Sequence, residues 1–318
     1  MRSSLGVAAI AAGSLLTAGL VFAEDTPPFW AYGIPPGAMA AATPAAPDPS
    51  TKHLPGNNLG FTRAQISNGF GPADWYPGDH PQMPPIVAKG KEPAVRACGL
   101  CHYPNGKGRA ENAGVSGLPT SYFIQQMLDF KNDNRKSAES RKANTKAMAV
   151  FAKNMTDDEI KQAADYFGAI KWTPWIKVVE SKTAPKTRVQ GGLFLAEGDE
   201  KEPLGNRIVE VPVNAEATEV LRDPHSGFIA YVPVGSIKRG EALVKNKQCA
   251  LCHGEGLKGL GPVPPLAGRS PSYLMRQMYD MEHGFRHGLW TDLMKPVVAN
   301  LTDQQLLEIC AYVAAQTP

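Results

Sequence analysis

The sequence lacks a clear excess of charge of either sign: its 318 residues include 33 Lys and Arg against 30 Asp and Glu. Nucleic-acid-binding domains present a strongly basic face, so the near balance argues against nucleic acid and against a strongly charged protein partner. Beyond residue 23 the sequence also lacks a long apolar run. We therefore expect no bilayer-spanning helix in that part, and membrane association only through partners.

The first 23 residues are the exception to this lack of apolar runs. They carry one positive charge at Arg2, an apolar run over residues 5–22, and a small-residue site ending at Ala23, ahead of two acidic residues. This pattern is typical of a secretory signal peptide cleaved after Ala23, with an uncleaved membrane anchor as the alternative. Export predicts a periplasmic protein.

Cysteine is scarce, and its five copies are an odd number that does not suit a disulfide scaffold in an oxidising compartment. Four of them form two CxxCH motifs, Cys98–His102 and Cys249–His253, which lie too far apart for an ordinary zinc ribbon. The fifth, Cys310, falls on the apolar face of a helical stretch. We expect it to be a buried small hydrophobic residue rather than a reactive thiol or an iron ligand.

Covalent haem attachment accounts for the two CxxCH motifs. Thioether bonds to the two haem vinyl groups need sulfur atoms one helical turn apart, and the adjacent His then reaches the iron. The sequence thus predicts two covalently bound haem c groups with their iron. The predicted attachment and ligand residues are Cys98, Cys101 and His102 for the first haem, and Cys249, Cys252 and His253 for the second.

An internal repeat supports this prediction. A Ser-Tyr pair follows each motif at the same distance, at residues 121–122 and 272–273, and opens a similar apolar helix. Each copy then carries a Met eight residues before a Thr that begins a capping box, Thr156 with Glu159 and Thr302 with a Gln. Apolar residues recur with helical spacing after both boxes, which predicts two helices that each bury one face.

The order of CxxCH motif, middle helix, extended stretch with a Met and capped last helix resembles the class I c-type cytochromes. The tandem copy resembles the dihaem periplasmic cytochromes c. The resemblance implies a mainly α fold with two class I cytochrome c domains in tandem, at residues 86–172 and 235–318. A Pro-rich N-terminal extension (24–85) and an irregular, β-containing inter-domain segment (173–234) complete the predicted domains. The family also has a short helix before each haem motif, from which the first copy departs at Pro93.

The same resemblance implies a methionine as the sixth iron ligand. Met148 and Met294 occupy equivalent places, in a stretch expected to be non-helical, and core packing is their alternative role. Met155 and Met281 have no Met counterpart in the other copy, and Met127 with its equivalent is expected to pack in the core.

The family implies further that a carbonyl after each motif holds the histidine, here that of Pro264 or Pro265. The equivalent loop of the first copy is Ala-Gly-Val at residues 113–115. It has no proline, so the sequence does not identify the acceptor for His102. Three further histidines, His225, His283 and His287, are expected to be solvated or structural.

Outside the repeats, the aromatic residues Trp30, Trp75 and Tyr76 are expected to lie against a haem domain or a partner. The runs at residues 206–213 and 227–234 predict β-strands.

Irons whose two axial positions are filled by protein cannot bind peroxide or oxygen without losing a ligand. The expected function is therefore electron transfer rather than catalysis, between a dehydrogenase donor and an oxidase, reductase or cytochrome acceptor. The chain could also be the cytochrome subunit of a dehydrogenase complex. A dihaem enzyme such as a cytochrome c peroxidase, or a haem-based sensor, is the alternative.

Overall fold

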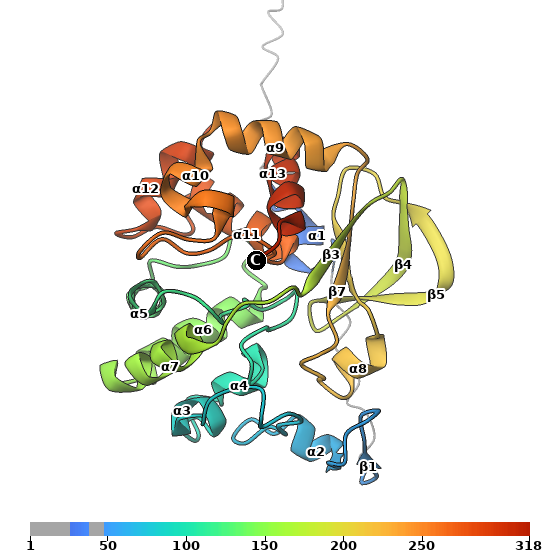
Figure 1. Cartoon of the computed structure of the whole chain (residues 1–318), viewed down its shortest axis with the longest axis vertical. Coiled ribbons are helices and arrows are strands. Elements are labelled where there is room, and N and C mark those ends of the chain that lie inside the picture. Colours follow the sequence, from blue (N-terminus) through green and yellow to red (C-terminus); the bar gives the residue numbers. More distant parts are fainter. Residues whose placement is uncertain (1–25, 38–47) are drawn as a thin grey trace, which may run out of the picture.

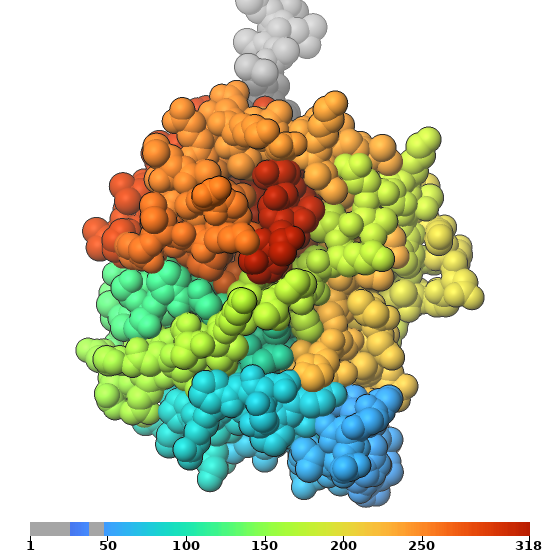
Figure 2. All heavy atoms as spheres, in the orientation of Figure 1, coloured from blue at the N-terminus to red at the C-terminus, as the bar shows by residue number. Residues whose placement is uncertain are grey.

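The computed structural model describes residues 26–37 and 48–318 (Figure 1). The predicted signal peptide, residues 1–23, and part of the extension lie outside the described residues. Across those two ranges, no helix is both long and apolar enough to cross a membrane. Two groups of helices correspond to the sequence repeats (Figure 1). In Figure 2 the second repeat, in orange and red, lies above the first, which runs from cyan to green.

The first repeat is built from short and medium helices around one apolar core. Its elements are α3 (Pro85–Ala88), α4 (Cys98–His102), α5 (Thr120–Lys131), α6 (Ala143–Asn154) and α7 (Asp157–Ala169). The capping box predicted at Thr156 is present, since its hydroxyl accepts the Glu159 N–H at 3.2 Å and the Glu159 carboxylate accepts the Thr156 N–H at 2.7 Å. Met127, Phe130, Ile160 and Phe167 meet in the core beneath these helices.

The second repeat has the same order of helices, but its first helix is longer and a 3₁₀ turn follows its motif. Its elements are α9 (Ser236–Asn246), α10 (Cys249–His253), the 3₁₀ turn η1 (Glu255–Leu257), α11 (Pro271–Glu282), α12 (Thr291–Val298) and α13 (Asp303–Ala315). The capping box at Thr302 is present here too. Helix α9 crosses α13 so closely that a Cβ at Gly240 would stand 1.9 Å from the Glu308 carbonyl oxygen. Only glycine permits this approach of the two helix backbones.

The stretch before the first CxxCH motif does not form the helix that precedes the second. Residues 89–97 instead make a turn in which the Lys91 N–H donates to the Val95 carbonyl at 2.6 Å, and the Val95 N–H donates back at 2.8 Å. Pro93 lies within this turn and has no N–H to contribute to a helix. The departure expected at this residue is therefore confirmed.

The segment between the repeats forms two small sheets. Strands β3 (Ile176–Glu180), β7 (Phe228–Val232) and β6 (Val209–Pro212) make one sheet in that order, with β3 parallel and β6 antiparallel to β7. Strands β4 (Thr183–Gln190) and β5 (Leu193–Pro203) form a hairpin that projects from the body (Figure 1), and α8 (Ala215–Glu219) follows β6. The two predicted strands are β6 and β7, and β3 to β5 were not predicted.

The described part of the N-terminal extension packs on the rest of the chain through short elements. These are α1 (Phe29–Tyr32), β1 (Thr51–Lys52), β2 (Phe61–Thr62) and α2 (Arg63–Ile66). Trp30 is buried in the core of the second repeat, and the indole N–H of the buried Trp75 donates to the Leu221 carbonyl at 2.7 Å. Tyr76 stacks on His225 with ring centres 3.7 Å apart. The predicted packing against a haem domain is thus observed for Trp30, whereas Trp75 and Tyr76 lie against the inter-domain segment instead.

Candidate functional site

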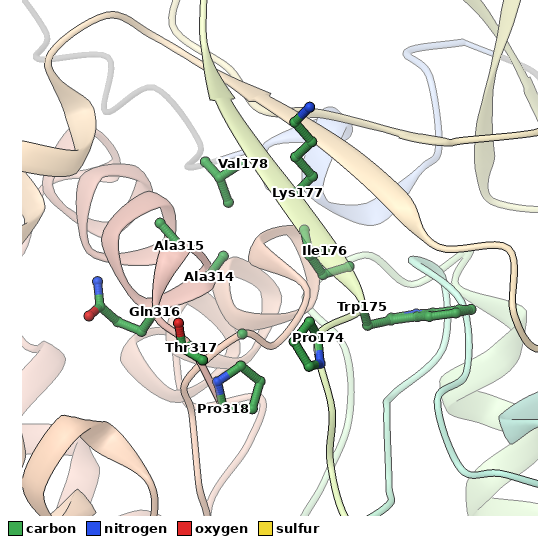
Figure 3. Close-up of a pocket in the computed structure, with 11 residues that line it drawn as sticks. Pro174, Trp175, Ile176, Lys177, Val178, Ala314, Ala315, Gln316, Thr317 and Pro318 are labelled. Atoms are coloured by element: carbon green, nitrogen blue, oxygen red, sulfur yellow. The ribbon is translucent and has the colours of Figure 1, made fainter. Parts of the chain in front are cut away.

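A cavity of about 240 Å³ lies where β3 meets the end of α13 (Figure 3). Its lining residues are Pro174, Trp175, Ile176, Lys177, Val178, Gly268, Ala314, Ala315, Gln316, Thr317 and Pro318. This set contains no His, Cys, Asp or Glu side chain, and Lys177 is its only side chain that carries an acid–base group, so it offers no metal-ligand set. The cavity therefore does not resemble a functional centre.

A second cavity, of about 290 Å³, lies inside the first repeat and brings the predicted site residues together. Cys98, Cys101, His102 and Met148 all line it. Apolar side chains from α5 to α7 form most of the wall, and part of the lining comes from α11 of the second repeat. Other residues that line this cavity include Met127, Phe130, Arg135, Lys142, Phe151, Met155, Phe167, Tyr273, Arg276, Gln277 and Asp280.

His102 is held by the loop that follows its motif. Its Nδ1–H donates to the Ala113 carbonyl oxygen at 2.8 Å, which fixes the ring and leaves Nε2 as the nitrogen available to a metal. Burial lowers the pKa of His102, so the neutral form that binds metal is favoured.

His253 is held in the same way in the second repeat. Its Nδ1–H donates to the Pro264 carbonyl at 2.9 Å, and burial lowers its pKa as well. The prediction that Pro264 or Pro265 supplies the acceptor is confirmed for Pro264. The first-repeat acceptor, Ala113, was not named from the sequence, yet both acceptors lie 11 residues after their histidine. That shared spacing could have identified it.

The expected non-helical setting of Met148 and Met294 is wrong, because they lie inside helices α6 and α12. The α6 sequence is rich in Ala and Lys and has no Pro or Gly, so it favours a helix over an extended chain. Met148 nevertheless lines the same cavity as the first CxxCH motif. Met294 is half-buried and, like Cys249, packs against the core of the second repeat.

Two other methionines line the first-repeat cavity. Met127 is buried in the core, as predicted. Met155 lies at the C-terminal cap of α6 and is also buried. It therefore offers a second thioether sulfur in this cavity, as an alternative iron ligand to Met148. In the second repeat Met281 is buried in the core.

The two repeats meet through pairs of equivalent residues on α5 and α11 and just after them. Arg135 donates to the Tyr273 hydroxyl at 3.0 Å and to the Gln277 side-chain oxygen at 2.8 Å. Its repeat counterpart Arg286 donates to the Tyr122 hydroxyl at 2.9 Å and to the Gln126 oxygen at 2.6 Å. Each contact therefore has its mirror image, and we call this set of residues the reciprocal cluster.

The first-repeat cavity suits a haem on three grounds: two thiols and a metal-ready imidazole at one motif, apolar and aromatic walls, and buried cations. Lys142 donates to the Tyr32 carbonyl at 3.1 Å, and Arg276 donates to the carbonyls of Ala31 and Ala110 at 2.6 and 2.9 Å. Both basic groups have neutral partners in those bonds, so they can also face the carboxylates of a haem, although burial lowers the pKa of Lys142 to about 7. The carboxyl of Asp280 also lines the cavity, and it accepts the Tyr32 hydroxyl at 2.7 Å.

Of the three further histidines, His225 and His283 have side-chain partners, whereas the His287 side chain is exposed. His225 pairs with Asp79, with 2.5 Å between Nε2 and Oδ2. His283 stacks on Tyr279 with ring centres 3.9 Å apart. Cys310 is fully buried, which raises the pKa of its thiol, so the expected small buried residue is confirmed.

The two CxxCH motifs differ in exposure. Leu100 in the first motif is 7% exposed, and Arg222 of the inter-domain segment donates to its carbonyl. Its counterpart Leu251 in the second motif is 74% exposed. The chain thus covers one motif helix with its own inter-domain segment and leaves the other open.

Comparison with known proteins agrees with this picture. Residues 87–171 match the family described as Cytochrome c, and residues 235–313 match Cytochrome C oxidase, cbb3-type, subunit III. A cytochrome c4 of Thiocapsa roseopersicina is 38% identical over 84 residues, which are 26% of this chain and 41% of that protein. The chain therefore spans less than half the length of that relative.

Two further relatives are matched over most of their length. A thiosulfate dehydrogenase electron acceptor of Thiomonas intermedia is 24% identical over 227 residues, covering 70% of this chain and 80% of that protein. Cytochrome c-554(548) of Halomonas halodenitrificans is 36% identical over 69 residues, covering 21% of this chain and 83% of that protein. With its two CxxCH motifs and two matching domains, the chain belongs to the cytochrome c family and carries two covalently bound haem c groups.

Proposed function

We propose that this dihaem cytochrome c passes single electrons from a dehydrogenase-type donor to an oxidase, reductase or second cytochrome. The observation that carries the proposal is the cavity of the first repeat, which we call domain 1, the second repeat being domain 2: the CxxCH residues and Met148 line this one space. Protein ligands at both axial positions suit an iron that changes only its oxidation state. The proposed location is the periplasm, after cleavage behind Ala23.

The proposed attachment residues are the four motif cysteines, with His102 and Met148 as axial ligands in domain 1 and His253 and Met294 in domain 2. When bound, each haem supplies a reversible one-electron centre. The chain keeps each histidine oriented through a backbone carbonyl, that of Ala113 or of Pro264. It also surrounds the first site with apolar side chains, which limit water and so reduce the reorganisation that accompanies a change of charge.

Exchange of electrons between the two domains is supported by where they meet. Tyr273 and Gln277 of domain 2 line the domain 1 cavity and also accept hydrogen bonds from Arg135. The domain contact therefore lies against the first haem site, and two centres in one chain can share electrons across it.

Contact with the donor is proposed at domain 2. Its motif residue Leu251 is 74% exposed, and Leu260, Leu289 and Leu293 are exposed as well. Exposed apolar residues gathered in one domain suit a protein–protein contact. A dehydrogenase is the proposed partner because the Thiomonas intermedia relative is named as an acceptor for one.

The test is ligand replacement with spectroscopy. The wild type should show two haems per chain, a far-red methionine-to-iron band when oxidised, and little carbon monoxide binding when reduced. Met148→Ala and Met294→Ala should each open one iron, lower its potential and admit carbon monoxide. Met155→Ala and Met281→Ala are the matched controls and should leave the band in place.

Different outcomes would change the conclusion. Loss of the band in Met155→Ala but not in Met148→Ala would move the domain 1 ligand to Met155. Stoichiometric carbon monoxide binding or peroxide turnover by the fresh wild-type protein would favour the peroxidase-type enzyme instead.

A further inference from the structure

Arg269 is a buried arginine of domain 2 that reaches into domain 1. It precedes α11, is 3% exposed, and donates from Nη1 to the Gly114 carbonyl and from Nη2 to the Ser116 carbonyl, both at 2.9 Å. Its guanidinium group lies over the indole ring of Trp172, 4.1 Å from the ring centre. Two hydrogen bonds from one planar fork fix the two carbonyls relative to each other.

The loop that Arg269 holds is the loop that orients His102. Ala113, whose carbonyl accepts the His102 Nδ1–H at 2.8 Å, directly precedes Gly114. The backbone at Gly114 packs against Trp172, since a Cβ there would lie 2.8 Å from the indole ring. Loop, indole and guanidinium therefore form one packed unit, with the His102 acceptor at its edge.

We propose that Arg269 is a positioning residue for His102, through which domain 2 sets the reduction potential of the domain 1 haem. This inference rests on the proposed electron-carrier function and adds a residue to it. The strength and direction of the hydrogen bond at the distal nitrogen of an axial histidine determine how much electron density the ring gives to iron.

The two domains restrict the loop that carries the histidine's acceptor in different ways. In domain 2 the acceptor loop contains Pro264 and Pro265, whose rings restrict the backbone without outside help. The corresponding loop of domain 1, residues 113–115, has no proline and includes a glycine. The position equivalent to Arg269 in domain 1 is Leu118, which has no group to donate. Arg269 thus supplies from outside the rigidity that prolines supply within domain 2.

The charge of Arg269 acts in a known direction. Burial lowers its pKa to about 10, so the guanidinium remains protonated at neutral pH. A fixed positive charge near iron favours the ferrous state, because that state carries one less positive charge than the ferric state. Removing the charge should therefore lower the potential of the domain 1 haem, because the guanidinium group is bonded to the loop that holds His102.

The test compares Arg269→Gln with Arg269→Lys in the full-length protein loaded with haem. Spectroelectrochemical titration of Arg269→Gln should show one midpoint shifted downward and the other unchanged. Arg269→Lys keeps the positive charge, so its downward shift should be smaller. Because Lys cannot bridge both carbonyls, it should still loosen the His102 loop as Arg269→Gln does. Arg207→Gln is the matched control, since Arg207 bonds within residues 202–204 and contacts neither motif, and it should shift neither midpoint.

A second readout follows the histidine itself. In the reduced protein, NMR should show that the His102 Nδ1 proton exchanges with solvent about tenfold faster in both Arg269 variants than in the wild type. This factor is expected when about one net hydrogen bond is weakened. Exchange of the His253 Nδ1 proton should be unaffected. This exchange can be measured whether or not the protein serves as a carrier, so failure of the proposed function and failure of this inference are distinguishable. Equal shifts of both midpoints, or unchanged exchange at His102, would overturn it.

Discussion

Replacing Gly240 by Ala should separate the helices on which domain 2 is built. The added Cβ would stand 1.9 Å from the Glu308 carbonyl oxygen and 2.8 Å from the Tyr312 Cβ. Since such contacts are normally above about 3 Å, helices α9 and α13 must move apart by about 1 Å, and overpacking of this kind costs about 1–3 kcal/mol. We take about 3 kcal/mol because the obstacle is backbone. Ala is the better helix former by about 1 kcal/mol, which leaves a net loss of about 2 kcal/mol.

The assay is urea-induced unfolding of the haem-loaded protein, followed by circular dichroism in the far ultraviolet and in the haem bands. The matched control is Gly78→Ala, because a Cβ at Gly78 meets nothing within 4 Å. We expect the control to stay within about 0.5 kcal/mol of the wild type. If Gly240→Ala unfolds at the same urea concentration as Gly78→Ala, the close crossing of α9 and α13 is wrong.

Two further predictions concern buried polar groups. Tyr32→Phe removes the 2.7 Å hydrogen bond to buried Asp280 and should lower the free energy of unfolding in urea by about 1.5–3 kcal/mol. Tyr103→Phe is the control: it removes a hydroxyl with no partner among the described residues and should be neutral or stabilising. Equal losses in both variants would contradict the hydrogen bond between Tyr32 and Asp280. Burial raises the pKa of the Glu210 carboxyl in the folded state. The folded protein therefore keeps the carboxyl proton at pH values where the unfolded chain has released it. The free energy of unfolding consequently falls as pH rises from the unfolded pKa, about 4.3, through the folded pKa. Glu210→Gln should flatten that fall at pH values above the unfolded pKa, and an unchanged slope would show that Glu210 does not contribute.

The chemistry of the site could be predicted from the sequence better than its local structure. The CxxCH spacing identified His102 and His253 because covalent haem attachment depends on residues adjacent in sequence. The family resemblance narrowed the His253 acceptor to Pro264 or Pro265, and the structure shows Pro264. The setting of Met148 was wrong because family resemblance outweighed the helix-forming composition of α6.

The β4–β5 hairpin was missed for a similar reason. Strand β5 ends in a charged stretch without an alternating pattern, so it does not look like a strand. The two-residue Gly191-Gly192 connection, with φ of 58° and 88°, is nevertheless a strong hairpin signal that could have located it. Arg269 could not be found from sequence, because its partners lie more than 150 positions away and depend on how the domains dock.

The reciprocal cluster has a consequence for the origin of the chain. When Arg135 contacts Tyr273 and Arg286 contacts Tyr122, the same patch of each domain is complementary to itself, which is the property of a two-fold symmetric dimer interface. A single-haem ancestor with this patch could already pair with an identical copy. One chain holds the two halves in a fixed ratio and lets each differ from the other, as Leu118 and Arg269 do at equivalent positions.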